Sequence, residues 1–425
     1  MLRAPGGQTR RAARFQPLRP GIVTFDRRGR AGCEWLEGLG WAERTEATGL
    51  PLSFIVTAAK LAYLREAEPE LYRRAAWFLC YEDLLTAHLT GRPRISDSLA
   101  QRTWLLDRRR HAWDEGSLAD LDLASRLAEV APMGADLGLV SAAAAGAFGL
   151  PPGCRVVAGA HDQTAALVGA GAILPGTAAH STGTVDCLSL TLRDGEAAPF
   201  TGRGYGLGLH PLPGLAVTLA FGFGGGSLLA WLQGVVGSPD VGTLLEGVPT
   251  APGDEFAVPF WAGSGTPDLD AADRGAFFGL TLNAGRGTMV AAVLRGMALE
   301  SRRNLHILAE LGVRVREARL VGGGTRNPDW NQIRADVTGC GYTEMRVRDA
   351  GCLGAAVLAA VGIGLYRDVA AACDAMVRTD RRFTPLPEHH AAYTALFPGY
   401  LAAVAGTRAA RVAAQAPPAA GARTD

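Results

Sequence analysis

The most informative stretch of the chain is Val156-Val157-Ala158-Gly159-Ala160-His161-Asp162-Gln163-Thr164. Its apolar start predicts a buried strand over residues 155–159, and the small residues after Asp162 predict a helix. A lone carboxylate at a strand end, flanked by small side chains, is suited to accept a proton from a bound hydroxyl group. The alternative is that Asp162 caps the following helix, since aspartate is a favoured N-cap residue. Both roles are compatible if the side chain faces a cleft.

A second candidate site follows at Ser181-Thr182-Gly183-Thr184-Val185. A Gly-Thr turn can offer backbone N–H groups and a hydroxyl group to phosphate oxygens. On the residues alone, a plain hairpin turn is the simpler interpretation. The flanking apolar residues predict strands over 178–190 and 215–223.

A third candidate is Val321-Gly322-Gly323-Gly324-Thr325-Arg326-Asn327-Pro328, which follows a predicted strand over 317–321. Three glycines after a strand allow a ligand to lie against bare backbone, so the stretch favours nucleotide binding. A flexible strand–helix connection is the alternative. The glycines are contiguous, unlike the Gly-x-Gly-x-x-Gly fingerprint, and a nicotinamide-dependent dehydrogenase is therefore excluded.

Two further features limit the possible chemistry. The only lysine is Lys60, and no glycine loop precedes it, so the chain has no P-loop and any ATP must be held by another phosphate cradle. The loop at 261–275 carries Asp268 and Asp270. These side chains could touch a metal, although solvated turn aspartates are the commoner alternative.

Composition indicates the class of protein and its compartment. The 425 residues are enough for two domains, and the alternation of strands with helices predicts an α/β fold. The net charge of +1 and the lack of a bilayer-length apolar run give no reason to expect a nucleic-acid or membrane partner. The seven scattered cysteines suit a reducing cytoplasm. The Ala/Pro/Arg-rich end, 401–425, is predicted to be a disordered tail.

The order of these motifs, more than any one of them, resembles the FGGY carbohydrate kinases, which phosphorylate sugars or polyols with ATP. The similarity covers roughly residues 19–400. The stretches that carry it are Pro20–Arg28, Lys60-Leu61, Leu89-Thr90-Gly91, Ser96-Asp97-Ser98, Gly159–Asp162, Gly183-Thr184, Thr266-Pro267, Arg274-Gly275, Gly322–Asn327 and Gly351–Ala356.

The resemblance implies two actin-like (ribonuclease H-like) α/β domains with a cleft between them. These are an N-terminal, sugar-side domain over 1–172, lacking its first strands, and a C-terminal, nucleotide-side domain over 173–400. The implied ligands are Mg-ATP and a sugar or polyol, and a homodimer is expected as one possible state. The implied residues are Asp162 as the base, Gly183, Thr184, Gly323, Gly324 and Asn327 at the nucleotide, and Asp26, Arg27, His161 and Gln163 at the sugar.

The His161-Asp162-Gln163 variant points, by resemblance, to a ketose such as a pentulose or hexulose rather than glycerol. The chain also departs from the family pattern. Thr24 replaces a Trp, and Val185 replaces a Ser.

No Asp-x-Gly-Thr phosphate turn precedes Pro20; the formal match at Asp114–Ser117 is interpreted as a helix cap. We therefore expect little or no activity from these residues alone, because a missing phosphate loop removes transition-state stabilisation. The alternative function is a non-catalytic sugar- or nucleotide-binding protein on a kinase scaffold.

Overall fold

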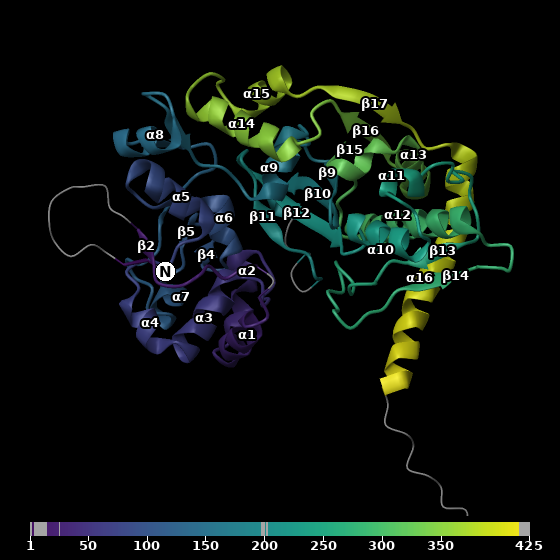
Figure 1. The fold of residues 1–425 in the computed structure, drawn as a ribbon, viewed down its shortest axis with the longest axis horizontal. Helices are drawn as coiled ribbons and strands as arrows, with labels where there is room; N and C mark the ends of the chain where they lie inside the picture. The colour runs from purple at the N-terminus through teal and green to yellow at the C-terminus, as the bar shows by residue number, and fades with distance from the viewer. Residues whose placement is uncertain (1, 4–14, 25, 197–199, 201–202, 416–425) are drawn as a thin grey trace, which may run out of the picture. The chain divides into compact units, whose positions relative to one another are not determined.

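The computed structural model describes all residues except 1, 4–14, 25, 197–199, 201–202 and 416–425. The chain forms two compact units (Figure 1). The first contains Met1–Ile173, Thr191–Thr218 and Asp349–Val377. The second contains Leu174–Leu190, Leu219–Arg348 and Arg378–Asp425. Two segments beyond residue 173, one from the middle of the chain and one from its late part, thus belong to the first unit, whereas the sequence predicts two contiguous domains.

The first unit is built from short helices and short strands around an aromatic core. Trp41 and Trp104 are fully buried and stack with ring centroids 5.8 Å apart. The elements up to residue 173 are β1 (Leu2–Arg3), β2 (Gln16–Pro17), α1 (Gly29–Gly38), the 3-10 helix η1 (Trp41–Arg44), α2 (Thr45–Thr48), α3 (Thr57–Ala67), α4 (Pro69–Arg74), α5 (Tyr81–Thr90), β3 (Arg94–Ser96), α6 (Asp97–Arg102), β4 (Leu106–Asp107), β5 (Ala112–Trp113), α7 (Glu115–Asp120), β6 (Glu129–Ala131), β7 (Asp136–Leu139), α8 (Ala142–Phe148), β8 (Arg155–Val157) and α9 (Asp162–Gly169).

Two local predictions can be compared directly with this unit. The run Gly21-Ile22-Val23-Thr24-Phe25 predicts a short strand by its sequence, but residues 20–24 have no strand pairing, and Phe25 lies outside the described residues. Lys60 explains the difference, because its Nζ donates to the carbonyl of Thr24 at 2.9 Å and so holds this segment by a side chain. The helix-cap interpretation of Asp114 is confirmed, since its carboxylate accepts from the backbone N–H of Ser117.

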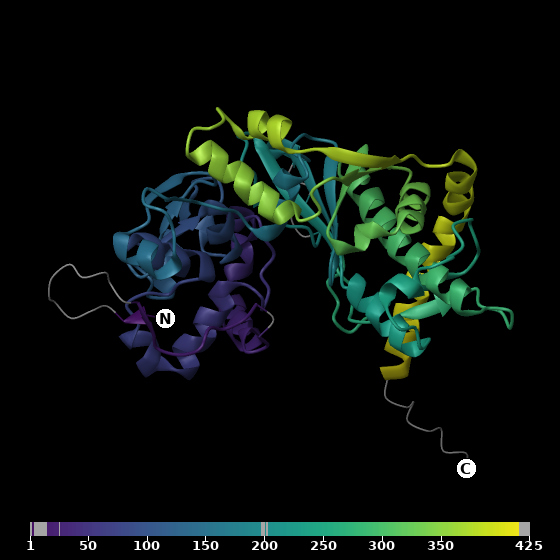
Figure 2. The same ribbon diagram turned by 45° about the horizontal axis from the view of Figure 1, so that its top comes forward.

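Helix α9, which begins at Asp162, packs against α14 (Ala350–Gly362) from the late part of the chain (Figures 1 and 2). The two helices approach closely because glycines face backbone at the crossing. A Cβ atom added to Gly354 would lie 1.8 Å from the carbonyl oxygen of Ala165, and one added to Gly169 would lie 1.9 Å from that of Ala350. The helix that carries Asp162 is therefore held by a contact that only glycine permits. The other elements of this unit beyond residue 173 include β11 (Leu207–Leu209), the first half of β12 (Leu215–Gly222) and α15 (Val369–Met376).

The main sheet is mixed and has the strand order β11-β12-β10-β9-β15-β16-β17, which ends with β16 (Gly341–Met345) and β17 (Thr379–Phe383). The strands from β9 onward in that order belong to the second unit. Strand β9 (Thr177–Thr182) pairs antiparallel with β10 (Asp186–Arg193) and parallel with β15 (Glu317–Val321). The prediction of β15 is confirmed to the residue. The hairpin-turn interpretation of Gly183-Thr184 is confirmed, and the predicted strand over 178–190 is therefore two strands, β9 and β10, joined at Gly183–Val185.

Helix α13 (Pro328–Thr338) packs on the β16 and β17 strands of this sheet. Helix α12 (Arg286–Glu310) is buried along most of its length and packs on α13. The remaining elements are α10 (Gly226–Val235), α11 (Val241–Leu244), β13 (Phe256–Val258), β14 (Ala276–Phe278) and α16 (Pro387–Gln415). No helix in the described part of the chain is long and apolar enough to cross a bilayer.

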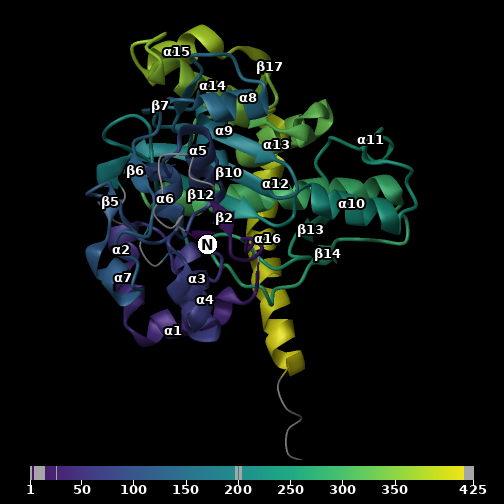
Figure 3. The same cartoon turned by 60° about the vertical axis from the view of Figure 1, so that its left-hand side comes forward.

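Residues 401–415, predicted to be disordered, are instead the second half of α16 (Figures 1 and 3). Alanine-rich sequence favours a helix once a partner surface is present. Ala403 and Val404 are buried, and Arg408 pairs with Asp273 at 2.7 Å. Residues 416–425 lie outside the described residues.

A buried histidine of the first unit makes its stability depend on pH. His210 accepts the backbone N–H of Leu212 at Nδ1 over 3.0 Å, and its Nε2 lies 3.3 Å from Thr191 Oγ1, so the neutral ring fits both contacts. Burial lowers the pKa of His210 to about 4.

The pKa of His210 is lower in the native state than in the unfolded state. The stability that the neutral ring contributes is therefore complete above pH ~6.5 and is lost as the pH falls toward 4. We expect the wild-type unfolding free energy to fall by up to roughly 2–3 kcal/mol more than that of His210→Asn over this range, in urea titrations. Parallel curves for the two proteins would contradict this assignment.

Candidate active site

Asp162 occupies the first position of α9 and presents its carboxylate to solvent within the first unit. Its side chain is 81% exposed. The N-cap residue is His161 rather than Asp162, so the helix-cap alternative is not what the structure shows. Asp162 Oδ1 accepts the backbone N–H of Gln163 at 2.6 Å and lies 3.2 Å from His161 Nε2. The other carboxylate oxygen, Oδ2, takes part in neither contact and is open to a ligand.

The turn before Asp162 is held by two side chains from neighbouring helices. Glu82 of α5 accepts the backbone N–H of Gly159 at 3.3 Å, and Ser98 of α6 accepts that of His161 at 3.1 Å. Burial raises the pKa of Glu82. Ser98 belongs to a motif that was recognised in the sequence. Glu82 was not recognised as a residue of the site, because its contact with Gly159 spans 77 residues of sequence. These two hydrogen bonds fix the backbone at Gly159 and His161 and so set the position of Asp162.

His161 is uncharged at neutral pH, because burial, with help from the charge of Arg102, lowers its pKa to about 4. A neutral imidazole therefore lies beside the Asp162 carboxylate.

The predicted sugar-side pair, Asp26 and Arg27, precedes α1 in the same unit. Asp26 is engaged with Arg28 through a 2.6 Å ion pair, which holds the pKa of Asp26 well below its usual range. Arg27 is exposed. The described contacts of Asp26 are thus local, and its placement at a sugar stays a prediction.

In the second unit, the predicted phosphate turn Gly183–Val185 is a hairpin braced by the start of α10. The carbonyl of Gly183 accepts the N–H of Gly226 at 2.7 Å, and that of Thr184 accepts the N–H of Ser227 at 3.3 Å. Gly225 fits under the turn, since an added Cβ would lie 2.5 Å from the Val185 carbonyl carbon. A methyl group on Gly183 itself would meet nothing within 4 Å, so its outer face is open.

The glycine turn lies at the same sheet edge, because β9 and β15 are adjacent parallel strands and their carboxyl ends meet there. Gly322 has a φ of +88°, and Gly324 packs against Thr182 so closely that an added Cβ would be 2.6 Å from its methyl group. Gly323 is exposed and has open space beyond it. Asn327 caps α13 by accepting the N–H of Trp330 at 2.8 Å, so this side chain also has a structural task.

The two loop aspartates considered as metal contacts are paired with arginines instead. Asp268 lies 2.5 Å from Arg303, and Asp270 lies 2.9 Å from Arg411 of α16. Within the described residues, no group of three or more His, Cys, Asp or Glu side chains could hold a metal ion. These aspartates fasten the loop to α12 and α16.

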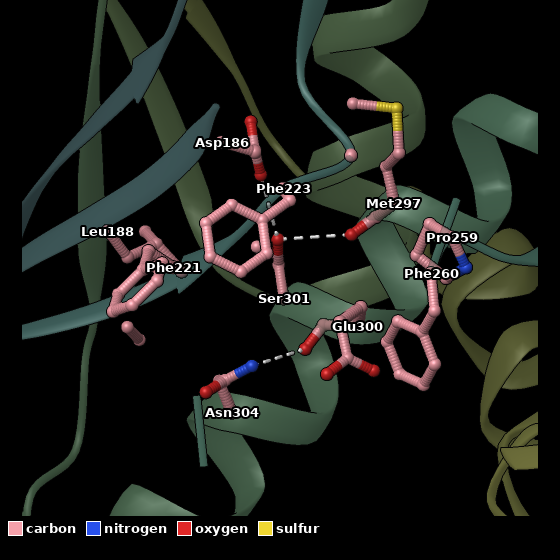
Figure 4. A pocket seen from close by; sticks show the side chains of 13 residues that line it. Asp186, Leu188, Phe221, Phe223, Pro259, Phe260, Met297, Glu300, Ser301 and Asn304 are labelled. Atoms are coloured by element: carbon pink, nitrogen blue, oxygen red, sulfur yellow. Dashed lines mark hydrogen bonds between the residues drawn. The ribbon is translucent and has the colours of Figure 1, made fainter. Parts of the chain in front are cut away.

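A pocket adjoins the hairpin within the second unit, between the ends of β10 and β12 and helix α12 (Figure 4). Its polar members are satisfied inside the protein: Ser301 Oγ donates to the carbonyl of Met297 at 3.1 Å, and Asn304 Nδ2 to that of Glu300 at 3.0 Å. Its other walls are largely apolar. The lining residues are Asp186, Leu188, Ala220, Phe221, Gly222, Phe223, Gly224, Pro259, Phe260, Met297, Glu300, Ser301 and Asn304.

Comparison with known proteins identifies the family. The N-terminal and C-terminal domain profiles of the FGGY family of carbohydrate kinases match residues 12–169 and 178–363. A glycerol kinase of Aromatoleum aromaticum is 32% identical over 392 residues, which cover 87% of this chain and 76% of that protein. The chain belongs to the FGGY family of carbohydrate kinases.

Other FGGY members are similar over the same span. A xylulose kinase of Staphylococcus epidermidis is 25% identical over 398 residues, which cover 90% of this chain and 77% of that protein. The crystal structure of a xylulose kinase from Rhodospirillum rubrum superposes with a TM-score of 0.80 at 25% identity, covering 93% of this chain and 81% of that one. The two-domain FGGY kinase fold predicted from the motifs is therefore confirmed.

Family membership also confirms the class of reaction. FGGY proteins are phosphotransferases with an alcohol group as acceptor, and they use ATP as the phosphoryl donor. The predicted nucleotide turns and the predicted base lie on separate units, each formed by its own local contacts. Sequence reasoning missed the side chains that brace these segments, such as Glu82 under the turn that precedes Asp162.

Proposed function

We propose that this FGGY kinase transfers the γ-phosphoryl group of Mg-ATP to a hydroxyl group of a ketose, such as a pentulose or hexulose, with Asp162 as the general base. The observation that carries this proposal is the exposed Asp162 carboxylate on a backbone fixed by Glu82 and Ser98. Accepting the hydroxyl proton while orienting the oxygen for in-line attack is the task such a carboxylate can perform.

On the nucleotide side, the turn at Gly183-Thr184 is proposed to hold phosphate oxygens, and Gly323, Gly324 and Asn327 the adenosine end. The support is that both turns lie at the carboxyl edge of adjacent parallel strands, where α/β sheets usually bind ligands. Bare backbone is open at Gly183 and Gly323.

The metal is proposed to arrive with the nucleotide. Magnesium is commonly bound by one or two carboxylates together with substrate phosphates, and it needs no dedicated protein cage. The lack of a three-ligand cluster in the described residues fits that mode. When bound, Mg²⁺ would neutralise charge on the phosphates, while Thr184 would offer its exposed hydroxyl group nearby.

On the sugar side, Asp26, Arg27, His161 and Gln163 are proposed to contact the substrate. The support for a ketose is the His161-Asp162-Gln163 variant of the base motif. The kinase is proposed to work in the cytoplasm: its seven cysteines all lie in the described residues, and none forms a disulfide.

The proposal is tested by measuring ADP release from Mg-ATP across pentuloses, hexuloses and polyols, with Mg-ADP binding measured separately by calorimetry. We expect turnover with one ketose to exceed that with glycerol by at least about tenfold in kcat/KM, a difference of ~1.4 kcal/mol. Preference for glycerol would overturn the substrate class. Mg-ADP binding without turnover on any acceptor would support the non-catalytic alternative.

A further inference from the structure

Beneath the two nucleotide turns lies a buried charged group that the proposed chemistry does not use. Arg334 of α13 is 1% exposed, and its guanidinium carbon lies 3.9 Å from the ring centroid of Trp330. Its Nη2 donates to Thr182 Oγ1 at 2.6 Å, and its Nη1 donates to Asn331 Oδ1 at 3.1 Å. One side chain thus contacts two polar partners from different elements.

The first partner belongs to the hairpin. Thr182 is the residue immediately before Gly183, and its hydroxyl donates to Asp186 Oδ1 at 2.9 Å across the pair of strands. Asp186 Oδ2 lies 2.8 Å from Nε2 of the fully buried His180, and Arg334 Nη2 lies 3.6 Å from Asp186 Oδ1. These contacts close the base of the turn that is proposed to hold phosphate.

The second partner belongs to the glycine turn. Asn331 Nδ2 donates to the carbonyl of Thr325 and to Glu344 Oε1, each at 2.8 Å. Thr325 in turn donates through its hydroxyl to the carbonyl of Gly322 at 2.8 Å. A continuous path of hydrogen bonds therefore runs from one nucleotide turn to the other, and Arg334 is its midpoint.

Buried arginine is costly unless its donors are satisfied, and its planar fork fixes two acceptors at once in a way that lysine cannot. We propose that Arg334 is a positioning residue that sets the hairpin turn Gly183–Val185 and the glycine turn Gly322–Arg326 in one fixed arrangement for the nucleotide. This inference rests on the proposed nucleotide role of the two turns. It predicts an effect on nucleotide affinity, separate from the sugar.

The test uses Mg-ADP calorimetry and steady-state kinetics on the full chain. Arg334→Gln is expected to raise the Kd for Mg-ADP and the KM for ATP by about 10- to 100-fold, and to leave the KM for the sugar within about twofold. Arg334→Lys restores the charge beside Asp186 but not the fork, so it is expected to recover thermal stability more than nucleotide affinity.

The matched control is Arg295→Gln, which removes another buried arginine of the same unit. Arg295 is 3% exposed and contacts Glu255 and the carbonyl of Ala251, not the turns. It should lose stability while the Kd for Mg-ADP stays within about twofold. An equal rise of Kd in both variants would overturn the positioning role and indicate a general loss of structure.

A milder variant covers the case in which Arg334→Gln does not fold. Thr182→Val keeps the side-chain shape and removes the hydroxyl that joins Arg334 to the hairpin, so a threefold to tenfold weaker Mg-ADP affinity, about 0.6–1.4 kcal/mol, is expected. An unchanged Kd in Thr182→Val overturns the inference. If the wild-type chain itself does not bind Mg-ADP, the proposed function fails as well, and that outcome is distinct from a failure of Arg334 alone.

Discussion

Asp162→Asn should lower kcat for sugar-dependent ADP release by about 10²- to 10⁴-fold, the usual contribution of a general base. Asparagine has nearly the same shape and can still accept the N–H of Gln163, which Asp162 Oδ1 accepts at 2.6 Å. It cannot take a proton from the sugar hydroxyl. Because Asp162 stands in the first unit and the nucleotide turns in the second, the Kd for Mg-ADP should remain within about twofold.

The matched control is Glu115→Gln. Glu115 is also the first residue of a helix, α7, and its side chain is 84% exposed, compared with 81% for Asp162. Both substitutions remove a negative charge from a helix N-terminus, at a cost of roughly 0.3–1 kcal/mol in stability. Only Asp162→Asn should lose turnover. Wild-type kcat in Asp162→Asn would remove this carboxylate from the mechanism.

Gly354→Ala should be among the most damaging single substitutions for the fold. The new methyl group would lie 1.8 Å from the carbonyl oxygen of Ala165, and backbone on α9 cannot swing aside as a side chain can. We expect a loss of about 3 kcal/mol or more in the free energy of unfolding, at the upper end for overpacking. Residual activity should fall too, because α9 carries Asp162.

Gly351→Ala provides the control on the same helix. A Cβ atom at Gly351 would meet only Asp349 Oδ1, at 3.8 Å. Since alanine favours a helix over glycine by up to ~1 kcal/mol, this variant should be neutral or slightly more stable. Urea unfolding of the two variants side by side measures the difference. Equal stabilities would mean that the α9–α14 crossing can relax at little cost.

Much of the local structure could be predicted from the sequence. Strand β15 and the glycines after it have a clear pattern, an apolar run followed by residues that free the backbone. The turn at Gly183-Thr184 was recognised as a possible hairpin, but the two strands beside it were not separated, because two residues are a short interruption between two apolar runs. The tail was misjudged because composition does not reveal that Arg408 finds a buried partner in Asp273.

The motifs of the candidate site could be predicted from the sequence, but the side chains that hold those motifs in place could not. Asp162 and the glycine turns carry local patterns, whereas Glu82, Asp186 and Arg334 matter through contacts with residues distant in sequence. Arg334 reaches Thr182 across 152 residues. No periodicity or composition signals such a pairing, because it depends on which strands become neighbours in the sheet.

The assignment of Asp349–Val377 to the first unit has a consequence for synthesis of the chain. Helix α9 emerges from the ribosome long before α14, its partner at the glycine crossing. At translation rates of about 5–20 residues per second, roughly 10–40 s separate the two helices, far longer than helix formation takes. The nascent first unit must wait with an apolar face uncovered, so chaperones that bind such faces should engage the chain during that interval and release it once α14 has been made.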